Sequence, residues 1–229
     1  MHDAHFHMSK ELFDLFKENK MKGICNVDSV EEYECIQSLL KEYPFEFSVG
    51  IHPWKADQIN FEEMKPLFSK TKFIGEIGLD NTWCDVDLDV QRRVFIQQLE
   101  FASKYQKPVI LHVKGMEQEA LNLIKRYKNT YIVHWYSCLD FLKEYDEVVD
   151  YFTVGPSVGI DEAVTNLVKN VDVHKLLLES DGIDAIEWAI QSRDYLKMFN
   201  HSIEQINEIK QMDCTDILDQ NFNQLLKRA

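Results

Sequence analysis

His5 and His7 are the first residues of this sequence whose types and spacing could do chemistry. They lie two residues apart near the start of the chain, and in an extended strand that spacing points both side chains to one face. His112 and His134 each close an apolar run, and Asp181 closes a third. Imidazole nitrogens and carboxylate oxygens are ligands of divalent metals in proteins. The pattern therefore indicates a metal site.

A lone carboxylate also stands inside an otherwise apolar run. Glu76 lies within residues 73–80, which read F-I-G-E-I-G-L-D. Burying a carboxylate without compensation costs several kcal/mol, so Glu76 must have a partner. We expect the histidines and Asp181 to be near it.

The elements that must position these side chains alternate regularly along the chain. Eight short apolar runs are separated by longer amphipathic segments, and the runs cover roughly 2–7, 22–27, 45–51, 73–78, 109–113, 130–135, 151–154 and 175–180. Several runs are apolar on both faces, which is typical of parallel strands covered by helices. Eight strand and helix pairs favour a TIM (β/α)8 barrel over a doubly wound open sheet.

We expect one domain, residues 1–229, with more helix at the C-terminus than a last barrel helix needs. Helical stretches at about 184–199, 202–212 and 215–227 should pack outside the barrel.

The carboxyl ends of the strands form the active-site face of such a barrel. Any one of the polar strand residues could equally be a satisfied core residue, but several of them converging on one barrel mouth favour a ligand set for two divalent cations. The predicted ligands are His5, His7, Glu76, His112, His134 and Asp181.

The charge of the chain limits its partners. With 25 basic and 39 acidic residues, the net charge is −14. Such a field repels nucleic acid at long range, so we do not expect a passive DNA-binding module, and a nucleic acid substrate must be held locally. No apolar run reaches the ~18 residues of a membrane span, and the N-terminus lacks a signal-peptide pattern. We expect a cytoplasmic protein with no membrane association and no obligate protein partner.

The motifs, taken in order, resemble those of the TatD-like metal-dependent hydrolases, a (β/α)8 branch of the amidohydrolase superfamily that includes TatD-type deoxyribonucleases. The likeness is carried by D-x-H-x-H at 3–7, G-x-H-P at 50–53, G-E-I-G-L-D at 75–80 and E-S-D at 179–181, and by a helix at 91–102 and a terminal helix at 216–226. It spans nearly the whole chain.

The resemblance implies a role for each matching position. One metal would be held by His5, His7, Glu76 and Asp181, and the other by Glu76, His112 and His134, so that Glu76 bridges the two. It also implies that His52 lies beside the scissile group; the alternative is a turn histidine preceding Pro53.

Three departures from the family pattern bear on the substrate. Lys114 stands where the family usually has arginine, which replaces a bidentate phosphate fork with a point charge. Residues 134–138 read H-W-Y-S-C in place of H-C-F-S-G, and the basic loop after Asp181 is replaced by the short acidic segment 182–188. Cleavage of long DNA is therefore a less secure expectation than hydrolysis itself.

The predicted function is hydrolysis of phosphodiester bonds by a metal-activated hydroxide, with short or single-stranded DNA ends as substrate. Asp181 would accept the proton from water, and Lys114 and His52 would steady the substrate. Zinc, manganese and magnesium are all compatible with the ligands. Two alternatives stay open. One is hydrolysis of a small amide, lactone or phosphate ester at the same site, and the other is a metal-binding barrel without turnover, although no ligand is missing.

Aromatic side chains also fall near the expected strand ends. Trp54, Trp83, Trp135 and Tyr136 could stack a nucleic acid base, but they could also simply line the rim of a pocket.

Overall fold

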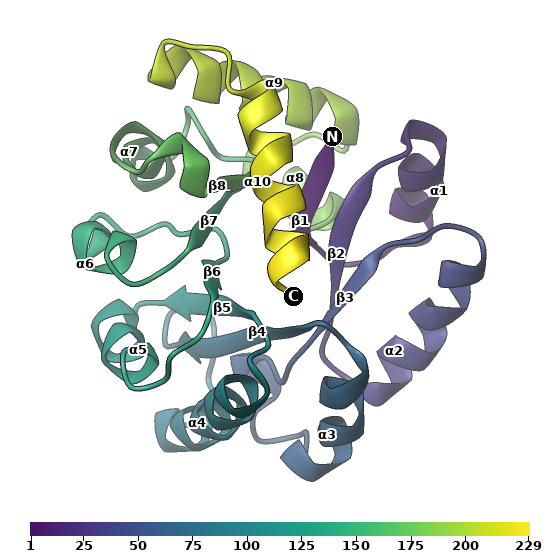
Figure 1. Ribbon diagram of the computed structural model, residues 1–229, viewed down its shortest axis with the longest axis vertical. Helices are drawn as coiled ribbons and strands as arrows, with labels where there is room; N and C mark the ends of the chain where they lie inside the picture. The colour runs from purple at the N-terminus through teal and green to yellow at the C-terminus, as the bar shows by residue number, and fades with distance from the viewer.

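The computed structural model describes residues 1–229 and has eight parallel strands in the order β1 to β8, surrounded by helices (Figure 1). The barrel prediction is confirmed. The strands are β1 (His2–Phe6), β2 (Lys22–Val27), β3 (Glu46–Val49), β4 (Phe73–Asp80), β5 (Val109–Lys114), β6 (Tyr131–Val133), β7 (Tyr151–Val154) and β8 (Leu176–Leu178).

A helix follows each strand, and most of these helices cover the outside of the barrel. The helices are α1 (Lys10–Asn19), α2 (Val30–Gln37), α3 (Phe61–Lys70), α4 (Leu88–Tyr105), α5 (Glu117–Ile124), α6 (Leu142–Asp146), α7 (Glu162–Asn170), α8 (Ile183–Ile190), α9 (Tyr195–Lys210) and α10 (Thr215–Arg228). Side-chain oxygens cap several of them, such as Ser9 for α1 and Asp161 for α7. None of these helices has the length and apolar content that crossing a bilayer would require.

Asp3 ties the last strand to the first. This buried carboxylate accepts hydrogen bonds from the Ser180 hydroxyl at 2.5 Å, the Ser180 amide at 3.0 Å and the Tyr195 hydroxyl at 2.8 Å. Burial raises the pKa of Asp3 to about 7, although these hydrogen bonds oppose the shift. Immediately beside this junction, the Asp181 amide donates to the His5 carbonyl at 3.0 Å. The junction therefore joins β1 to the segment after β8, next to the predicted ligands His5 and Asp181.

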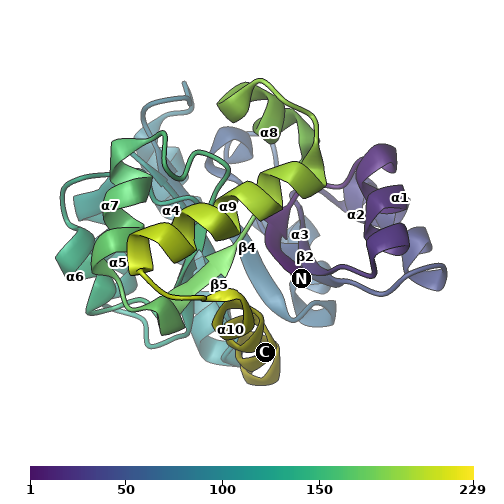
Figure 2. The ribbon, with the colours of Figure 1, turned by 90° about the horizontal axis from the view of Figure 1, so that it is seen from above.

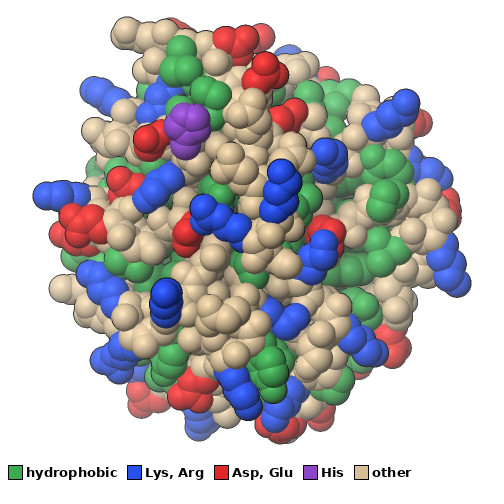
Figure 3. All heavy atoms as spheres, viewed as in Figure 1, with side chains coloured by type: hydrophobic (Ala, Val, Ile, Leu, Met, Phe, Trp, Pro, Cys, Tyr) green, Lys and Arg blue, Asp and Glu red, His purple; other side chains and the backbone are tan.

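The C-terminal helices do more than pack against the outside. Helix α9 runs along the side of the barrel, whereas α10 lies across its amino-terminal end, opposite α8 (Figures 1 and 2). Asn221 of α10 donates to the carbonyls of Val173 and Leu176, each at 2.8 Å. Seen from the α10 side, apolar side chains are scattered among basic and acidic ones (Figure 3).

A separate apolar cluster fills the barrel beneath α10. Phe222 and Leu225 of α10 pack against side chains from seven of the eight strands, namely Ala4, Ile24, Phe73, Ile110, Ile132, Tyr151 and Leu177. The Phe222 ring also stacks on the His2 imidazole, with the ring centres 4.6 Å apart. The amino-terminal end is thus a closed apolar core, which leaves the carboxyl ends of the strands as the open end.

Removing the Phe222 ring should therefore destabilise the barrel. Phe222→Ala is expected to lower the free energy of unfolding by about 3–5 kcal/mol, because truncating a fully buried phenylalanine leaves a cavity. Urea denaturation followed by circular dichroism measures the loss, with Gln224→Ala on the exposed side of α10 as the matched control. A loss no larger than that of the control would show that α10 does not seal the barrel.

Candidate metal centre

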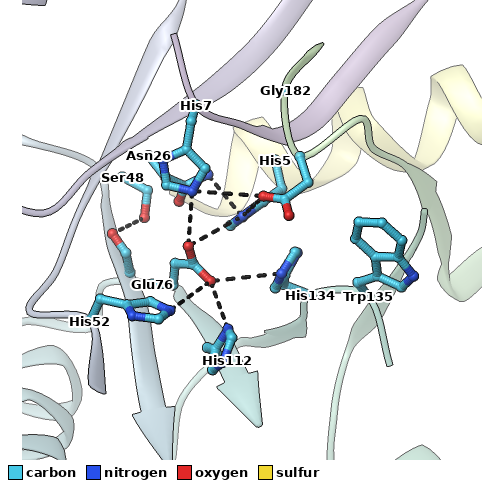
Figure 4. Close-up of polar contacts among 12 residues, drawn as sticks. His5, His7, Asn26, Ser48, His52, Glu76, His112, His134, Trp135 and Gly182 are labelled. Carbon is cyan, nitrogen blue, oxygen red and sulfur yellow. Dashed lines mark hydrogen bonds and ion pairs between the residues drawn. The ribbon is translucent and has the colours of Figure 1, made fainter. Parts of the chain in front are cut away.

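The predicted ligands converge at the open end of the barrel, where the four histidines surround the Glu76 carboxylate (Figure 4). Its Oε1 lies 3.1 Å from His7 Nε2 and 3.5 Å from His5 Nε2. Its Oε2 lies 3.1 Å from His112 Nδ1 and 3.7 Å from His134 Nε2. Each oxygen of Glu76 therefore faces a different pair of histidines.

Asp181 completes the first of these two groups. Its Oδ1 lies 3.3 Å from His5 Nε2 and 3.7 Å from His7 Nε2. The backbone of Asp181 is left-handed, with φ of 60°, and Gly182 follows with φ of 98°. This turn after β8 directs the carboxylate back toward β1.

Three buried polar side chains hold the imidazole rings from behind. Asp80 lies 3.0 Å from His112 Nε2, Glu179 lies 2.8 Å from His134 Nδ1, and the Asn26 amide lies 2.8 Å from His5 Nδ1. In each case the second ring nitrogen is left to face Glu76. Hydrogen bonds of this kind orient histidines that bind metals.

Sequence reasoning did not assign a role to these three residues. Asp80 and Glu179 are parts of the G-E-I-G-L-D and E-S-D motifs, so the motifs contained a signal for them. Asn26 has no such signal, because an asparagine within an apolar strand does not reveal which neighbouring strand it faces.

The donor set fits divalent metal ions. His5 Nε2 is buried without a hydrogen-bond partner and points at the oxygens of Glu76 and Asp181. A buried polar atom left unpaired is costly, and a bound cation would satisfy it. Donor atoms of His5, His7 and Glu76 lie within 4.8 Å of one another, as do those of His52, Glu76 and His112.

A third group of donor atoms within 4.8 Å comprises His5, His134 and Glu179. Because Glu179 is fully buried and already bonded to His134 Nδ1, we assign it to orienting that ring.

The charges of the cluster shift its pKa values in opposing directions. Burial alone would lower the pKa of His5, but Glu76 and Asp181 outweigh it and raise that pKa well above its usual value. Burial would raise the pKa of Glu76, yet the surrounding histidines hold it well below its usual range. The pKa of Asp181 is lowered to about 2, because His134 and His5 outweigh the effect of burial. Both carboxylates are therefore ionised at neutral pH, and an incoming metal would displace protons from imidazoles.

His52 behaves differently from the other histidines of the cluster. Burial, together with the nearby His112, lowers the pKa of His52 to about 3, so this ring is neutral at physiological pH. Its Nε2 lies 3.7 Å from Glu76 Oε2, and its Nδ1 accepts a hydrogen bond from the Trp54 amide at 3.2 Å. The structure thus places His52 at the edge of the cluster.

The cluster opens into a cleft of about 290 Å³, lined by His7, Asp28, His52, Trp54, Glu76, His112, His134 and Asp181. Asp28 was not among the predicted site residues. It follows β2 directly and its Oδ1 accepts from Lys55 Nζ at 2.7 Å. Its place after a strand end is the signal that could have identified it. Trp54 is anchored by its indole N–H, which donates to Asp80 Oδ2 at 2.7 Å.

Lys114 ends β5 but is not among the residues that line the cleft. Its Nζ donates to the Trp135 carbonyl at 2.7 Å and to the Ser137 hydroxyl at 2.9 Å, so it braces the segment after β6. Burial lowers the pKa of Lys114, although Glu179 and Asp181 partly oppose the shift. Its binding of substrate stays a prediction.

The close packing of β4 against β5 explains why the G-E-I-G-L-D motif has a glycine at position 78. A Cβ at this position would lie 1.7 Å from the His112 carbonyl oxygen. Only glycine lets β4 approach β5 this closely at the histidine that Glu76 contacts.

The strand order and the cluster at the open end define a (β/α)8 barrel of the metal-dependent hydrolase type. The model of the TatD related DNase family matches residues 2–227, and the chain belongs to this family.

Known proteins agree with this assignment. The chain is 25% identical over 243 residues to an uncharacterized metal-dependent hydrolase of Methanocaldococcus jannaschii, covering 99% of this chain and 96% of that protein. It is 26% identical over 181 residues to the deoxyribonuclease Tat-D of Schizosaccharomyces pombe, covering 67% and 56%. The crystal structure of a TatD homologue from Escherichia coli superposes with a TM-score of 0.81 at 21% identity, covering 97% and 95%.

The hydrogen bond between Glu179 and His134 should matter for metal binding. Glu179→Gln keeps the shape of the side chain but removes its charge, and loss of such an orienting carboxylate typically weakens metal affinity by about 10–100-fold. Titration of zinc into metal-free protein measures the change, and circular dichroism verifies the fold. Unchanged affinity would mean that Glu179 only fills space behind the ring.

Proposed function

We propose that this protein is a metal-dependent phosphodiesterase of the TatD type that acts on short or single-stranded DNA ends through a binuclear metal site. The observation that carries the proposal is the position of Glu76, whose two oxygens face separate groups of histidines. A carboxylate so placed is suited to bridge two cations. The first ion would be held by His5, His7, Glu76 and Asp181, and the second by Glu76, His112 and His134.

The ligand chemistry restricts the metal. Four imidazoles favour zinc, manganese or another transition metal over calcium, and the oxygens of Glu76 and Asp181 also admit magnesium. When bound, such ions lower the pKa of a water molecule and offset negative charge that develops on a phosphate.

Side chains of the cleft would divide the remaining tasks. Asp181 is ionised at neutral pH, and its carboxylate lines the cleft, so it can hold the proton that leaves the attacking water. His52 is neutral and lines the same cleft, so it can hydrogen-bond to a substrate oxygen without adding charge. Lys114 lies two residues after the cleft-lining His112 on β5, and it would steady the phosphate if it exchanged its bonds to the Trp135 carbonyl and the Ser137 hydroxyl.

The choice of DNA is supported by the relative from Schizosaccharomyces pombe, which bears the name deoxyribonuclease. The preference for chain ends follows from the charge of −14 and from the acidic segment after Asp181. Phosphates beyond the cleft would meet carboxylates there, so a long duplex would be held poorly.

A second candidate is hydrolysis of a small phosphate ester, amide or lactone at the same site. The cleft volume of about 290 Å³ favours it, because such a cleft accommodates a single small molecule. A barrel without turnover is the weaker alternative, since all six predicted ligands converge at the open end. Hydrolysis of a panel of thymidine oligonucleotides and small esters by the metal-loaded protein separates these candidates.

Asp181→Asn should reduce the rate strongly. The change removes charge and basicity at nearly constant size, so turnover of any accepted substrate is expected to fall by about 100-fold or more. Asp28→Asn is the matched control, because Asp28 also lines the cleft but pairs with Lys55. Equal losses in the two variants, or full activity in Asp181→Asn, would remove the proposed proton acceptor.

Salt should affect binding only weakly. Each phosphate neutralised by a protein cation contributes a slope of about −0.9 for duplex, or −0.7 for single strands, to the dependence of log affinity on log salt concentration. We expect a slope no steeper than about −2, and weaker binding of long duplex than of short single strands. Filter-binding titrations across a range of potassium chloride concentrations measure it. Tight duplex binding with a steep slope would instead indicate an extended basic groove.

A further inference from the structure

All four tryptophans of the chain lie after the carboxyl ends of strands, at the open end of the barrel. Trp54 follows β3 and Trp83 follows β4, while Trp135 follows β6 and Trp188 belongs to α8. Trp54 has a clear task, since its indole N–H bonds to Asp80. The other three form two edge-to-face pairs, Trp135 with Trp188 and Trp188 with Trp83, and nothing in the proposed hydrolysis uses them.

A series of rings leads outward from the metal ligand His134. The His134 and Trp135 ring centres are 6.3 Å apart, those of Trp135 and Trp188 are 6.2 Å apart, and those of Trp188 and Trp83 are 6.3 Å apart. Figure 4 shows the first step, with the Trp135 indole beside His134. Two ring contacts therefore connect Trp188 to His134, which lines the cleft.

The inner part of this series is rigid. Trp135 is buried, its indole N–H donates to the Ser157 hydroxyl at 3.1 Å, and a Cβ on Gly155 would lie only 2.7 Å from its ring. The outer two rings are exposed, with 61% of Trp83 and 72% of Trp188 accessible to solvent. Helix α8 is fixed by its buried Ile183 and Ile186, so the Trp188 ring is presented from a packed element.

The carboxylate that bonds to His112 also positions the outer rim. Asp80 Oδ2 faces His112 Nε2, and Asp80 Oδ1 accepts from the backbone amides of Thr82 and Trp83, each at 2.8 Å. Asp80 thus fixes the position of the segment that carries Trp83 relative to His112.

The charges around Trp83 and Trp188 select the kind of group that can lie there. Residues 81–87 carry only Asp85 and Asp87 as charged side chains, and α8 carries only Asp184 and Glu187. Arg193 pairs with Asp184 at 3.0 Å and with Glu187 at 2.5 Å, so the acidic charge of this surface is partly neutralised. The remaining acidic charge disfavours a phosphate, whereas a neutral planar ring carries no charge to be repelled. This surface therefore suits a neutral ring better than a run of phosphates.

We propose that Trp83 and Trp188 form a stacking subsite for one unpaired nucleobase, that of the nucleotide whose phosphate enters the metal cleft. The inference rests on the proposed function, and it narrows the substrate class to the terminal nucleotide of a single strand. A base within a duplex has no free face to stack, whereas an unpaired base stacks on an aromatic side chain whatever its sequence. Specificity for chain ends then arises from one aromatic contact and a repulsive surface around it.

The test compares two ligands that differ only in the base, thymidine 5′-monophosphate and deoxyribose 5-phosphate. Isothermal titration calorimetry on the metal-loaded protein measures both affinities without any phosphodiester cleavage. The native protein is expected to bind the nucleotide about tenfold more tightly than the sugar phosphate, in line with the usual contribution of one stacked base. Trp188→Ala should reduce this ratio to near one, and Trp188→Phe should keep most of it.

Two controls separate a binding role from a structural one. Tyr105→Ala removes an exposed aromatic side chain at the end of α4 and should leave the ratio unchanged. Because Trp188 is largely exposed, Trp188→Ala should also keep the native melting temperature. Sedimentation velocity on the same variants measures their oligomeric state, and so tests whether a second copy of the chain covers Trp83 and Trp188 instead of a nucleobase.

Several results would overturn the subsite. These are a native ratio of one, a ratio that Trp188→Ala does not change, or a dimer that Trp188→Ala dissociates while the ratio stays constant. Failure of the native protein to cleave any phosphodiester would count against the proposed function instead, because the binding comparison requires no turnover.

Discussion

A carboxylate buried in the mouth of an apolar barrel is the constraint on which the rest of the structure depends. Glu76 stands in a strand that is buried along its whole length, and only the surrounding imidazoles compensate its charge. Those imidazoles are fixed in turn by Asp80, Glu179 and Asn26. A chain of polar contacts therefore extends from the centre of the barrel to its rim, and each member is needed to orient the next.

The two ends of the barrel have different roles: the amino-terminal end is a packed apolar core, and the open end carries the polar cleft. At the amino-terminal end, α10 seals an apolar core in which Phe222 and Leu225 complete the packing. At the open end, carboxylates and imidazoles are concentrated within one small cleft, and cations bound there would add to the stability of the fold. The Asp3 junction connects the ends of the sheet and places His5 beside Asp181.

Sequence reasoning predicted the barrel and the convergence of the cluster because both have local signals. The spacing of His5 and His7 and the isolation of Glu76 in an apolar run are visible without any coordinates. Other features depend on contacts between strands distant in sequence. Asn26 meets His5 only because β1 and β2 pair in parallel, and Trp83 meets Trp188 only because the segment after β4 and helix α8 approach each other across the barrel mouth. The seal formed by α10 was likewise hidden, since an amphipathic helix does not reveal which surface it covers.

The central claim is that Glu76 lies between two divalent ions, and anomalous X-ray scattering from crystals grown with zinc or manganese tests it most directly. The account predicts two peaks in the anomalous difference map on either side of the Glu76 carboxylate, one beside His5, His7 and Asp181 and the other beside His112 and His134. A single peak under saturating metal, or peaks away from Glu76, would contradict it.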